Sequence, residues 1–224
     1  MIEFSGVSKH YENHTALSDV SLSIQSGEMV FLTGHSGAGK STALKLAMGI
    51  EKPSEGEIHV QRQDIVRLSR RHIPKLRRRI GMIHQNPQLL SDRSVFDNIA
   101  LPLVVHGYTH PEIKRRVQAA LDKVGLLAKE KLSPLSLSCG EQQRVGIARA
   151  IVSKPDILLA DEPTGNLDPE LSLDILRLFE AFHKAGVTVL IATHDLSLIA
   201  QMPHRMIILN QGKLVKKGKA HDAQ

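Results

Sequence analysis

Two short stretches of this 224-residue chain carry the residue types that bind and cleave phosphate groups. The first is GHSGAGKS, residues 34–41, which follows the apolar run MVFLT and precedes the helical pattern STALKLAMGI. A strand, a glycine-rich loop and a helix in this order are the context in which G-x-x-x-x-G-K-S binds phosphate. The glycines let backbone amides turn inward, so that these amides and the helix N-terminus form a nest for a β-phosphate. This context favours a phosphate loop over a glycine-rich turn that arose by chance.

The last side chains of this phosphate loop have separate tasks in binding a triphosphate. Lys40 would reach the β- and γ-phosphates, and the Ser41 hydroxyl would bind Mg²⁺. We therefore expect ATP to contact the whole loop and the start of the helix, namely Gly34, His35, Ser36, Gly37, Ala38, Gly39, Lys40, Ser41 and Thr42.

The second stretch, ILLADE at residues 157–162, is an apolar run that ends in two carboxylates. A buried strand that ends at Asp161 brings this carboxylate to the edge of the sheet beside the phosphate loop. There Asp161 would hold Mg²⁺ through water, and Glu162 would act as general base on the attacking water. In a purely structural interpretation, the two carboxylates cap a helix that begins near Pro163. The phosphate loop favours the catalytic interpretation.

The elements that must position these residues follow from the apolar patterning. Near-continuous apolar runs predict buried, mainly parallel strands over residues 29–33, 80–83, 157–161, 187–193 and 206–209. Alternating segments predict a smaller antiparallel sheet packed on the first, over residues 2–7, 20–24 and 56–60. Helical spacing over 110–127 and 140–154, with Pro111 near the start of the first helix, predicts a helical insertion. The expected fold class is therefore α/β.

Composition narrows the class of protein. Hydrophobic residues make up 42% of the chain and aromatic residues only 3%, so the core must be aliphatic. No apolar run approaches the roughly 20 residues that span a bilayer, and the N-terminus lacks the basic start and apolar stretch of a signal peptide. One cysteine excludes an internal disulfide and fits a reducing compartment. We expect a soluble, cytoplasmic chain.

Positive charge is concentrated in residues 67–79, RLSRRHIPKLRRR, within a chain of net charge +6. The plainest interpretation is a solvated helix face, and contact with anionic lipid or with a partner is the alternative. The segment has no aromatic residues, which argues against a platform for single-stranded nucleic acid. The polar residues 216–224 are expected to fray.

Further motifs follow the first two in a fixed order. They are Gln85 in IGMIHQNP, the segment LSCGEQQ at 137–143, GNLD at 165–168 and His194 in IATHD, with Tyr11 ahead of the phosphate loop. Alone, Gln85 would be an ordinary loop residue, His194 a surface histidine and Tyr11 a packing residue. Their order and spacing make the set specific, and the chain resembles the nucleotide-binding subunit of the ATP-binding cassette (ABC) family over almost its full length.

This resemblance implies a role for each residue of the set. Gln85 would sense Mg²⁺ and the γ-phosphate, His194 would position the attacking water, and Tyr11 would stack on adenine. Asp168 would lie at the seam of an ATP-dependent homodimer. The segment 137–143, here called the signature, would bind the γ-phosphate of the other subunit through Ser138, Cys139, Gly140 and Glu141. The expected catalytic residues are Glu162, His194 and Gln85, and the expected Mg²⁺ ligands are Ser41, Gln85 and Asp161.

The resemblance also implies a division of the single domain 1–224. Residues 1–84 and 156–224 would form a RecA-like core with the antiparallel β-subdomain. Residues 85–155 would form a helical subdomain that carries the signature.

Two residues depart from the family pattern. His84 stands where the family often has an aromatic such as Phe, and Cys139 stands at the first glycine of the signature. Ser138 and Glu141 fit a capping box that opens a helix running to about Lys154. A nucleophilic thiol would need a base and a covalent step that ATP hydrolysis does not use, so we interpret Cys139 as a small substitute for glycine in the phosphate site.

Within the family, the chain most resembles the cell-division branch. That resemblance implies an ATPase on the cytoplasmic face of the inner membrane, bound to an integral membrane subunit of the FtsX type, which controls peptidoglycan hydrolysis across the membrane. A LolD-type lipoprotein-release subunit and a MacB-type efflux subunit are the alternatives. A DNA-associated ATPase of the SMC or Rad50 type is a remote alternative. Such proteins carry long coiled coils between the phosphate loop and the signature, and this interval lacks sustained heptads here. We therefore expect no nucleic-acid partner.

Overall fold

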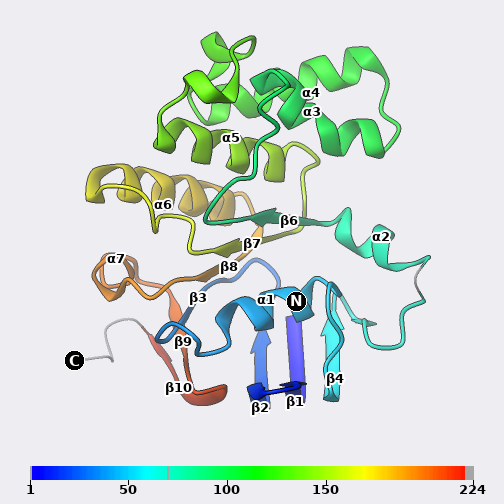
Figure 1. Ribbon diagram of the computed structural model, residues 1–224, viewed down its shortest axis with the longest axis vertical. Coiled ribbons are helices and arrows are strands. Elements are labelled where there is room, and N and C mark those ends of the chain that lie inside the picture. The colour runs from blue at the N-terminus through cyan, green and yellow to red at the C-terminus, as the bar shows by residue number, and fades with distance from the viewer. Residues whose placement is uncertain (1, 70, 220–224) are drawn as a thin grey trace.

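A six-stranded sheet lies at the centre of the computed structural model, which describes residues 2–69 and 71–219 (Figure 1). The strand order is β10-β9-β3-β8-β7-β6, and all neighbours are parallel except the edge pair β9 and β10. The strands are β3 (Met29–Thr33), β6 (Ile80–Ile83), β7 (Ile157–Asp161), β8 (Thr188–Ala192), β9 (Arg205–Asn210) and β10 (Lys213–Lys219). The predicted parallel sheet is confirmed.

A second, antiparallel sheet packs beneath the first in the order β2-β1-β4-β5. Its strands are β1 (Ile2–Tyr11), β2 (His14–Ile24), β4 (Glu55–Val60) and β5 (Gln63–Asp64). The predicted smaller sheet is therefore confirmed, but β1 and β2 are longer than their alternating segments, because they continue into a tight hairpin at residues 12–13.

Two hydrophobic cores lie on opposite faces of the central sheet. Along β3, Met29 and Phe31 join one core, whereas Val30 and Leu32 join the other. Since successive side chains of a strand point to opposite faces, a strand covered on both faces must be apolar throughout. This double burial explains why these strands appear as unbroken apolar runs in the sequence.

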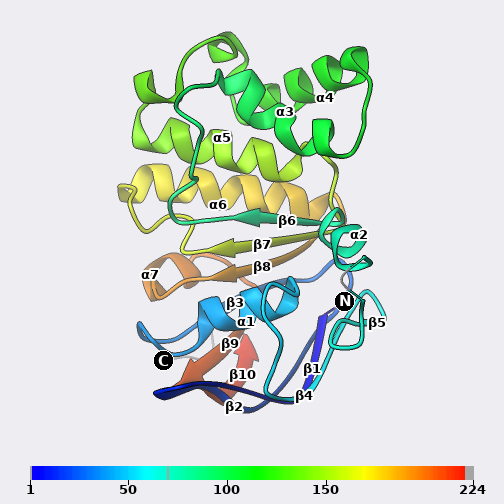
Figure 2. The ribbon, with the colours of Figure 1, turned by 45° about the vertical axis from the view of Figure 1, so that its right-hand side comes forward.

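Helices cover both faces of the central sheet (Figure 2). Helix α6 (Pro169–Lys184) lies on one face, and α5 (Cys139–Ile151), α3 (Val95–Val105) and α4 (His110–Lys123) stack beyond it. On the other face, α1 (Lys40–Ala47) separates the two sheets. The remaining helical turns are α2 (Ile73–Arg77), α7 (Leu196–Ile199), η1 (Leu127–Lys129) and η2 (Pro134–Ser136). Among the described residues, no helix combines the length and apolar character needed to cross a membrane.

Three sequence-based expectations are corrected here. The basic segment 67–79 is not one helix face, because helix within its described residues is limited to the five-residue α2. No helix begins near Pro163; a turn follows β7, and α6 begins at Pro169. Residues 216–219 are not frayed, since they pair with β9 as part of β10, while residues 220–224 lie outside the described residues.

The two predicted helices of the insertion are present but shorter than expected. The first ends at Lys123, because a left-handed glycine at 125 follows it, and the second ends at Ile151. The helix α3 between Val95 and Val105 was not predicted.

Candidate functional site

The carboxyl ends of four neighbouring parallel strands bring the predicted residues to one edge of the central sheet. The phosphate loop follows β3, His194 follows β8, Asp161 and Glu162 end β7, and Gln85 follows β6. In open parallel sheets the crevice outside the carboxyl ends is where ligands bind. The topology alone therefore gathers residues that are more than a hundred positions apart.

The phosphate loop turns sharply between β3 and α1. Gly39 has φ +102°, and a Cβ atom there would lie 2.5 Å from the carbonyl oxygen of Ala16, so only glycine fits. The buried Lys40 ammonium donates hydrogen bonds to the carbonyl oxygens of Gly34 and His35, at 2.7 and 3.3 Å. The lysine thus folds back over its own loop.

The other predicted loop residues surround this lysine. Ala38 is buried, whereas the tip of the loop and the Ser41 side chain are exposed at the sheet edge, at His35, Ser36, Gly37 and Ser41. Thr42 is half-buried in the first turn of α1.

The Glu162 side chain contacts both Lys40 of the phosphate loop and His194, the residue that follows β8. Its carboxylate Oε1 lies 3.4 Å from Lys40 Nζ and 2.9 Å from His194 Nδ1. The Glu162 backbone has φ +46°, which is uncommon for a residue with a side chain, and its N–H donates to the carbonyl of Ala192 at 2.8 Å. Local backbone strain of this kind costs about 1–3 kcal/mol and is concentrated at functional sites. Here it directs a carboxylate toward the lysine and the histidine.

The neighbouring Asp161 carboxylate is held differently. Its Oδ1 atom is closed to solvent and has no hydrogen-bond partner among the described residues. A buried carboxylate oxygen in this state is costly, so it marks a place for a cation or for water bound to one.

Gln85 lies against the turn that follows Glu162. Its Nε2 atom is 2.8 Å from the position that a Cβ atom of Gly165 would take. The backbone just before Gln85 is fixed by Gln143 of α5, whose Nε2 donates to the carbonyl of His84 at 3.1 Å. Gln143 is a residue that the sequence interpretation missed, although it lies within the signature. Burial lowers the pKa of His84, and the nearby Asp161 partly opposes that shift.

The signature forms the N-terminus of α5. The Ser138 hydroxyl accepts from the N–H of Glu141 at 3.3 Å, and the Glu141 carboxylate accepts from the N–H of Ser138 at 3.1 Å. The predicted capping box is therefore confirmed. An ion pair with Lys129 is the main cause that lowers the pKa of Glu141. Lys129 was missed because it lies twelve residues from its partner.

Within one chain, the start of the signature helix lies against the first turn of α6. A Cβ atom on Gly140 would lie 2.9 Å from Cδ1 of Leu171, in the first turn of α6. Asp168 caps that helix by accepting from the Leu171 N–H at 3.0 Å. Cys139 is exposed and shares a recess of about 170 Å³ with Gln85.

Tyr11, at the end of β1, lies beside the first turn of α1. Burial raises its pKa, and its hydrogen bond to Glu51 adds to the shift while Thr42 opposes it. One neighbour of the ring is His14, stacked at 5.1 Å between centroids, and Lys9 Nζ lies 5.0 Å from the ring centroid. Glu51, which orients the tyrosine, was not found from the sequence.

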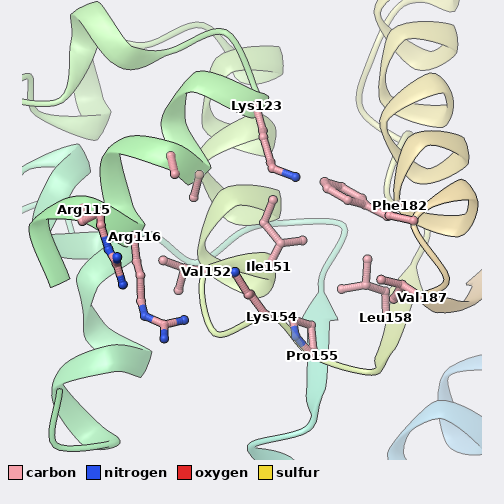
Figure 3. Close-up of a pocket in the computed structure, with 13 residues that line it drawn as sticks. Arg115, Arg116, Lys123, Ile151, Val152, Lys154, Pro155, Leu158, Phe182 and Val187 are labelled. Atoms are coloured by element: carbon pink, nitrogen blue, oxygen red, sulfur yellow. The ribbon is translucent and has the colours of Figure 1, made fainter. Parts of the chain in front are cut away.

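A cavity lies away from this sheet edge (Figure 3). It has a volume of about 430 Å³ and opens between α4 and α6 near the amino ends of β7 and β8, with Arg116 and Lys123 at its rim and Phe182 at its wall. None of the predicted site residues lines it. The chemistry of the phosphate loop and Glu162, rather than cavity size, identifies the candidate site.

Comparisons with known proteins show the family of this chain. A model of the ABC transporter family matches residues 17–165. The cell division ATP-binding protein FtsE of Escherichia coli K12 is 60% identical over 215 residues, which is 96% of this chain and 97% of that protein. FtsE of Mycobacterium tuberculosis is 46% identical over 218 residues, or 96% of this chain and 95% of that protein.

A solved structure extends the likeness to three dimensions. The ATP-binding cassette MJ0796, a dimer in a post-hydrolysis state bound to ADP and Pi, superposes with a TM-score of 0.90 at 33% identity, over 98% of this chain and 99% of that one. This chain therefore belongs to the ABC transporter family and is an ATP-binding, ATP-hydrolysing subunit.

Proposed function

We propose that this chain is the ATPase of a cell-division complex, and that it works as an ATP-dependent homodimer beneath an integral membrane subunit of the FtsX type. The observation that carries the catalytic part is the contact of the Glu162 carboxylate with both Lys40 and His194. The identity of 60% with FtsE over nearly the whole chain supports the cell-division part over lipoprotein release or efflux.

In this proposal Glu162 is the general base and His194 positions the attacking water. A base must come within hydrogen-bond reach of the proton that it removes, and the Glu162 carboxylate faces the same crevice as the phosphate loop. Lys40 exchanges its bonds to loop carbonyls for the β- and γ-phosphates. The ion pair of Glu162 with Lys40 then opens, which frees the carboxylate to take a proton from water.

Mg²⁺ fits this site because the buried Oδ1 of Asp161 lacks a partner among the described residues. Ser41, Gln85 and Asp161 would hold the ion, with Asp161 acting through a water molecule. When bound, the ion supplies positive charge to the β- and γ-phosphate oxygens. Gln85, which lies against Gly165, would report the state of the phosphates to the helices of residues 85–155, the proposed helical subdomain.

The second half of each site is proposed to come from the partner copy. In this chain the signature lies at a helix N-terminus, where backbone N–H groups and the helix dipole favour an anion. Among the described residues, its side chains bond to Lys129, His84 and Pro134, and Gly140 lies against Leu171; none of these hydrogen bonds or ion pairs reaches the phosphate loop. A second copy would therefore complete the charge around the γ-phosphate and make dimer closure depend on ATP. The dimeric state of MJ0796 supports this arrangement.

The proposed location is the cytoplasmic face of the inner membrane. The basic segment 67–79 would contact anionic lipid or the membrane subunit there. Recovery of the chain from native membranes tests this part, because an FtsX-type subunit should copurify with it. Copurification with a lipoprotein-release subunit instead would overturn the cell-division role and leave the ATPase chemistry intact.

The substitution Glu162→Gln tests the catalytic part. It keeps the size of the side chain but removes the base, so ATP hydrolysis should fall by about 10²–10⁴-fold. ATP binding should persist, and dimers should accumulate in size-exclusion chromatography with ATP. Glu170→Gln, an exposed carboxylate in the first turn of α6, is the matched control and should leave turnover unchanged. Normal turnover in Glu162→Gln would remove Glu162 from the base role.

A further inference from the structure

A second group of ligand-type side chains lies at the opposite end of α6 from Asp168. Glu180 and His183 are three residues apart and share one face of the helix, and His204 lies just before β9. One ligand atom from each of the three residues lies within 4.8 Å of the other two. The group is far from the phosphate loop, because β9 begins at this edge of the sheet and ends at the other.

The contacts inside this group leave one nitrogen without a partner. Glu180 Oε2 and His204 Nε2 are 2.6 Å apart, and the His183 and His204 rings meet edge to face with centroids 4.9 Å apart. His183 Nδ1 is closed to solvent and has no hydrogen-bond partner among the described residues. A buried polar atom without a partner is unfavourable, so it needs a ligand to satisfy it.

The Glu180 carboxylate offers one of its two oxygens to this group. Lys184 approaches the other oxygen, Oε1, at 3.6 Å and leaves Oε2 to the histidines. The side chains of Glu180 and His204 are only 23% and 12% exposed, so this is not a set of freely solvated acids.

We propose that Glu180, His183 and His204 form a binding site for a divalent transition-metal ion, with Zn²⁺ as the preferred ion. Two imidazoles and a carboxylate are ligands that Zn²⁺ takes at about 2.0–2.2 Å, whereas Mg²⁺ and Ca²⁺ prefer oxygen alone. Tetrahedral coordination needs ligand atoms about 3.3 Å apart. The ligand atoms lie within 4.8 Å of one another, so they would move closer together when the ion binds.

Such an ion would tie the end of α6 to the start of β9. Binding to the folded chain alone stabilises it by mass action, so the effect appears as a rise in Tm with metal concentration. The site is structural in this proposal and takes no part in ATP hydrolysis. Its failure would therefore leave the function proposed above untouched.

The test uses the full chain, stripped of metal with a chelator and free of nucleotide. Competition with a chromophoric chelator should give one Zn²⁺ per chain. A free Zn²⁺ concentration about 100 times Kd should raise Tm by roughly 5–10 °C. Co²⁺ used as a probe should give the visible absorption of a tetrahedral site, which a purely structural hydrogen bond would not produce.

Three variants separate metal binding from folding. His183→Asn and His204→Gln should each weaken Zn²⁺ binding roughly 10-fold or more. Glu180→Gln preserves a hydrogen bond to His204 but removes the anionic oxygen, so it should fold normally and still lose affinity. His110→Asn, at the exposed start of α4, is the matched control and should bind as the unsubstituted chain does.

Absence of stoichiometric Zn²⁺ or Co²⁺ binding to the unsubstituted chain would overturn the proposal. Unchanged affinity in Glu180→Gln and His183→Asn would overturn it equally, because the ion would then lie elsewhere.

Discussion

Replacing Ser138 by Ala separates the capping role of this residue from its proposed role in catalysis. The Ser138 hydroxyl accepts one hydrogen bond, from the Glu141 N–H at 3.3 Å. Loss of such a cap costs about 1 kcal/mol of stability. For a chain of this size, that loss corresponds to a fall in Tm of roughly 2–4 °C.

The effect on ATP hydrolysis should be much larger. Because the hydroxyl of Ser138 accepts from the backbone, its own hydrogen remains available to donate, and no acceptor for it occurs among the hydrogen bonds of the described residues. If that hydrogen reaches the γ-phosphate of the partner copy, its removal should lower kcat by about 10²–10³-fold. Stability and activity are thus predicted to change by very different factors.

Ser94→Ala is the matched control for this prediction. Ser94 also caps a helix, α3: its hydroxyl accepts from the Asp97 N–H at 3.1 Å and donates to the Asp97 carboxylate at 2.6 Å, and it lies outside the candidate site. Urea unfolding should show similar losses of stability for the two variants. Steady-state ATPase assays at saturating ATP should show a large loss only for Ser138→Ala.

Equal activity of the two variants would refute the reasoning, because Ser138 would then be a cap and nothing more. A fall of several kcal/mol in the free energy of unfolding of Ser138→Ala would also refute the reasoning. In that case reduced hydrolysis would follow from a damaged helix α5 and not from a missing phosphate contact.

Three further predictions use residues around the same helix. Cys139→Gly should keep or raise ATPase activity, whereas alkylation of Cys139 should impair it; an inactive glycine variant would give the thiol a role of its own. Gly81→Ala should lower stability by about 1–3 kcal/mol in urea unfolding, since its Cβ would lie 2.5 Å from the Ala150 carbonyl oxygen, and an unchanged midpoint would contradict this. The lowered pKa of Glu141, beside Lys129, means that the unfolded chain binds this proton more tightly. Its contribution to stability should therefore be complete above the unfolded value of 4.5 and be lost as pH falls through the folded-state pKa. Glu141→Gln should remove that part of the pH dependence, and identical pH profiles of unfolding would exclude it.

The sheet edge that carries the candidate site could be predicted because its sequence signals are local. The phosphate loop, the apolar strand before Asp161 and the Ser138 capping box each depend on neighbours in the sequence. Strands buried on both faces must be apolar throughout, so their limits follow closely from hydropathy. The parallel order of these strands then brings the motifs together without any further information.

Other elements depend on contacts between distant segments. The polar composition of residues 216–219 is typical of a frayed terminus, yet the backbone of these residues pairs with β9 and forms an edge strand. Helix α3 is apolar around much of its circumference and contains Pro102, so its sequence has neither a clear polar face nor a helical appearance. Helix α3 is stabilised by packing against α4 and α5, and no local sequence pattern predicts that packing.

Cys139 stands where the family has glycine, and the space around it differs from the space around its neighbour Gly140. At position 140 any side chain would meet Leu171 at 2.9 Å, and Leu171 in turn donates its N–H to Asp168. A side chain there would require the Leu171 side chain, in the first turn of α6, to shift. Position 139, by contrast, is exposed beside the recess that also contains Gln85. The thiol is therefore accommodated at the exposed start of α5, whereas a side chain at position 140 requires Leu171 to move.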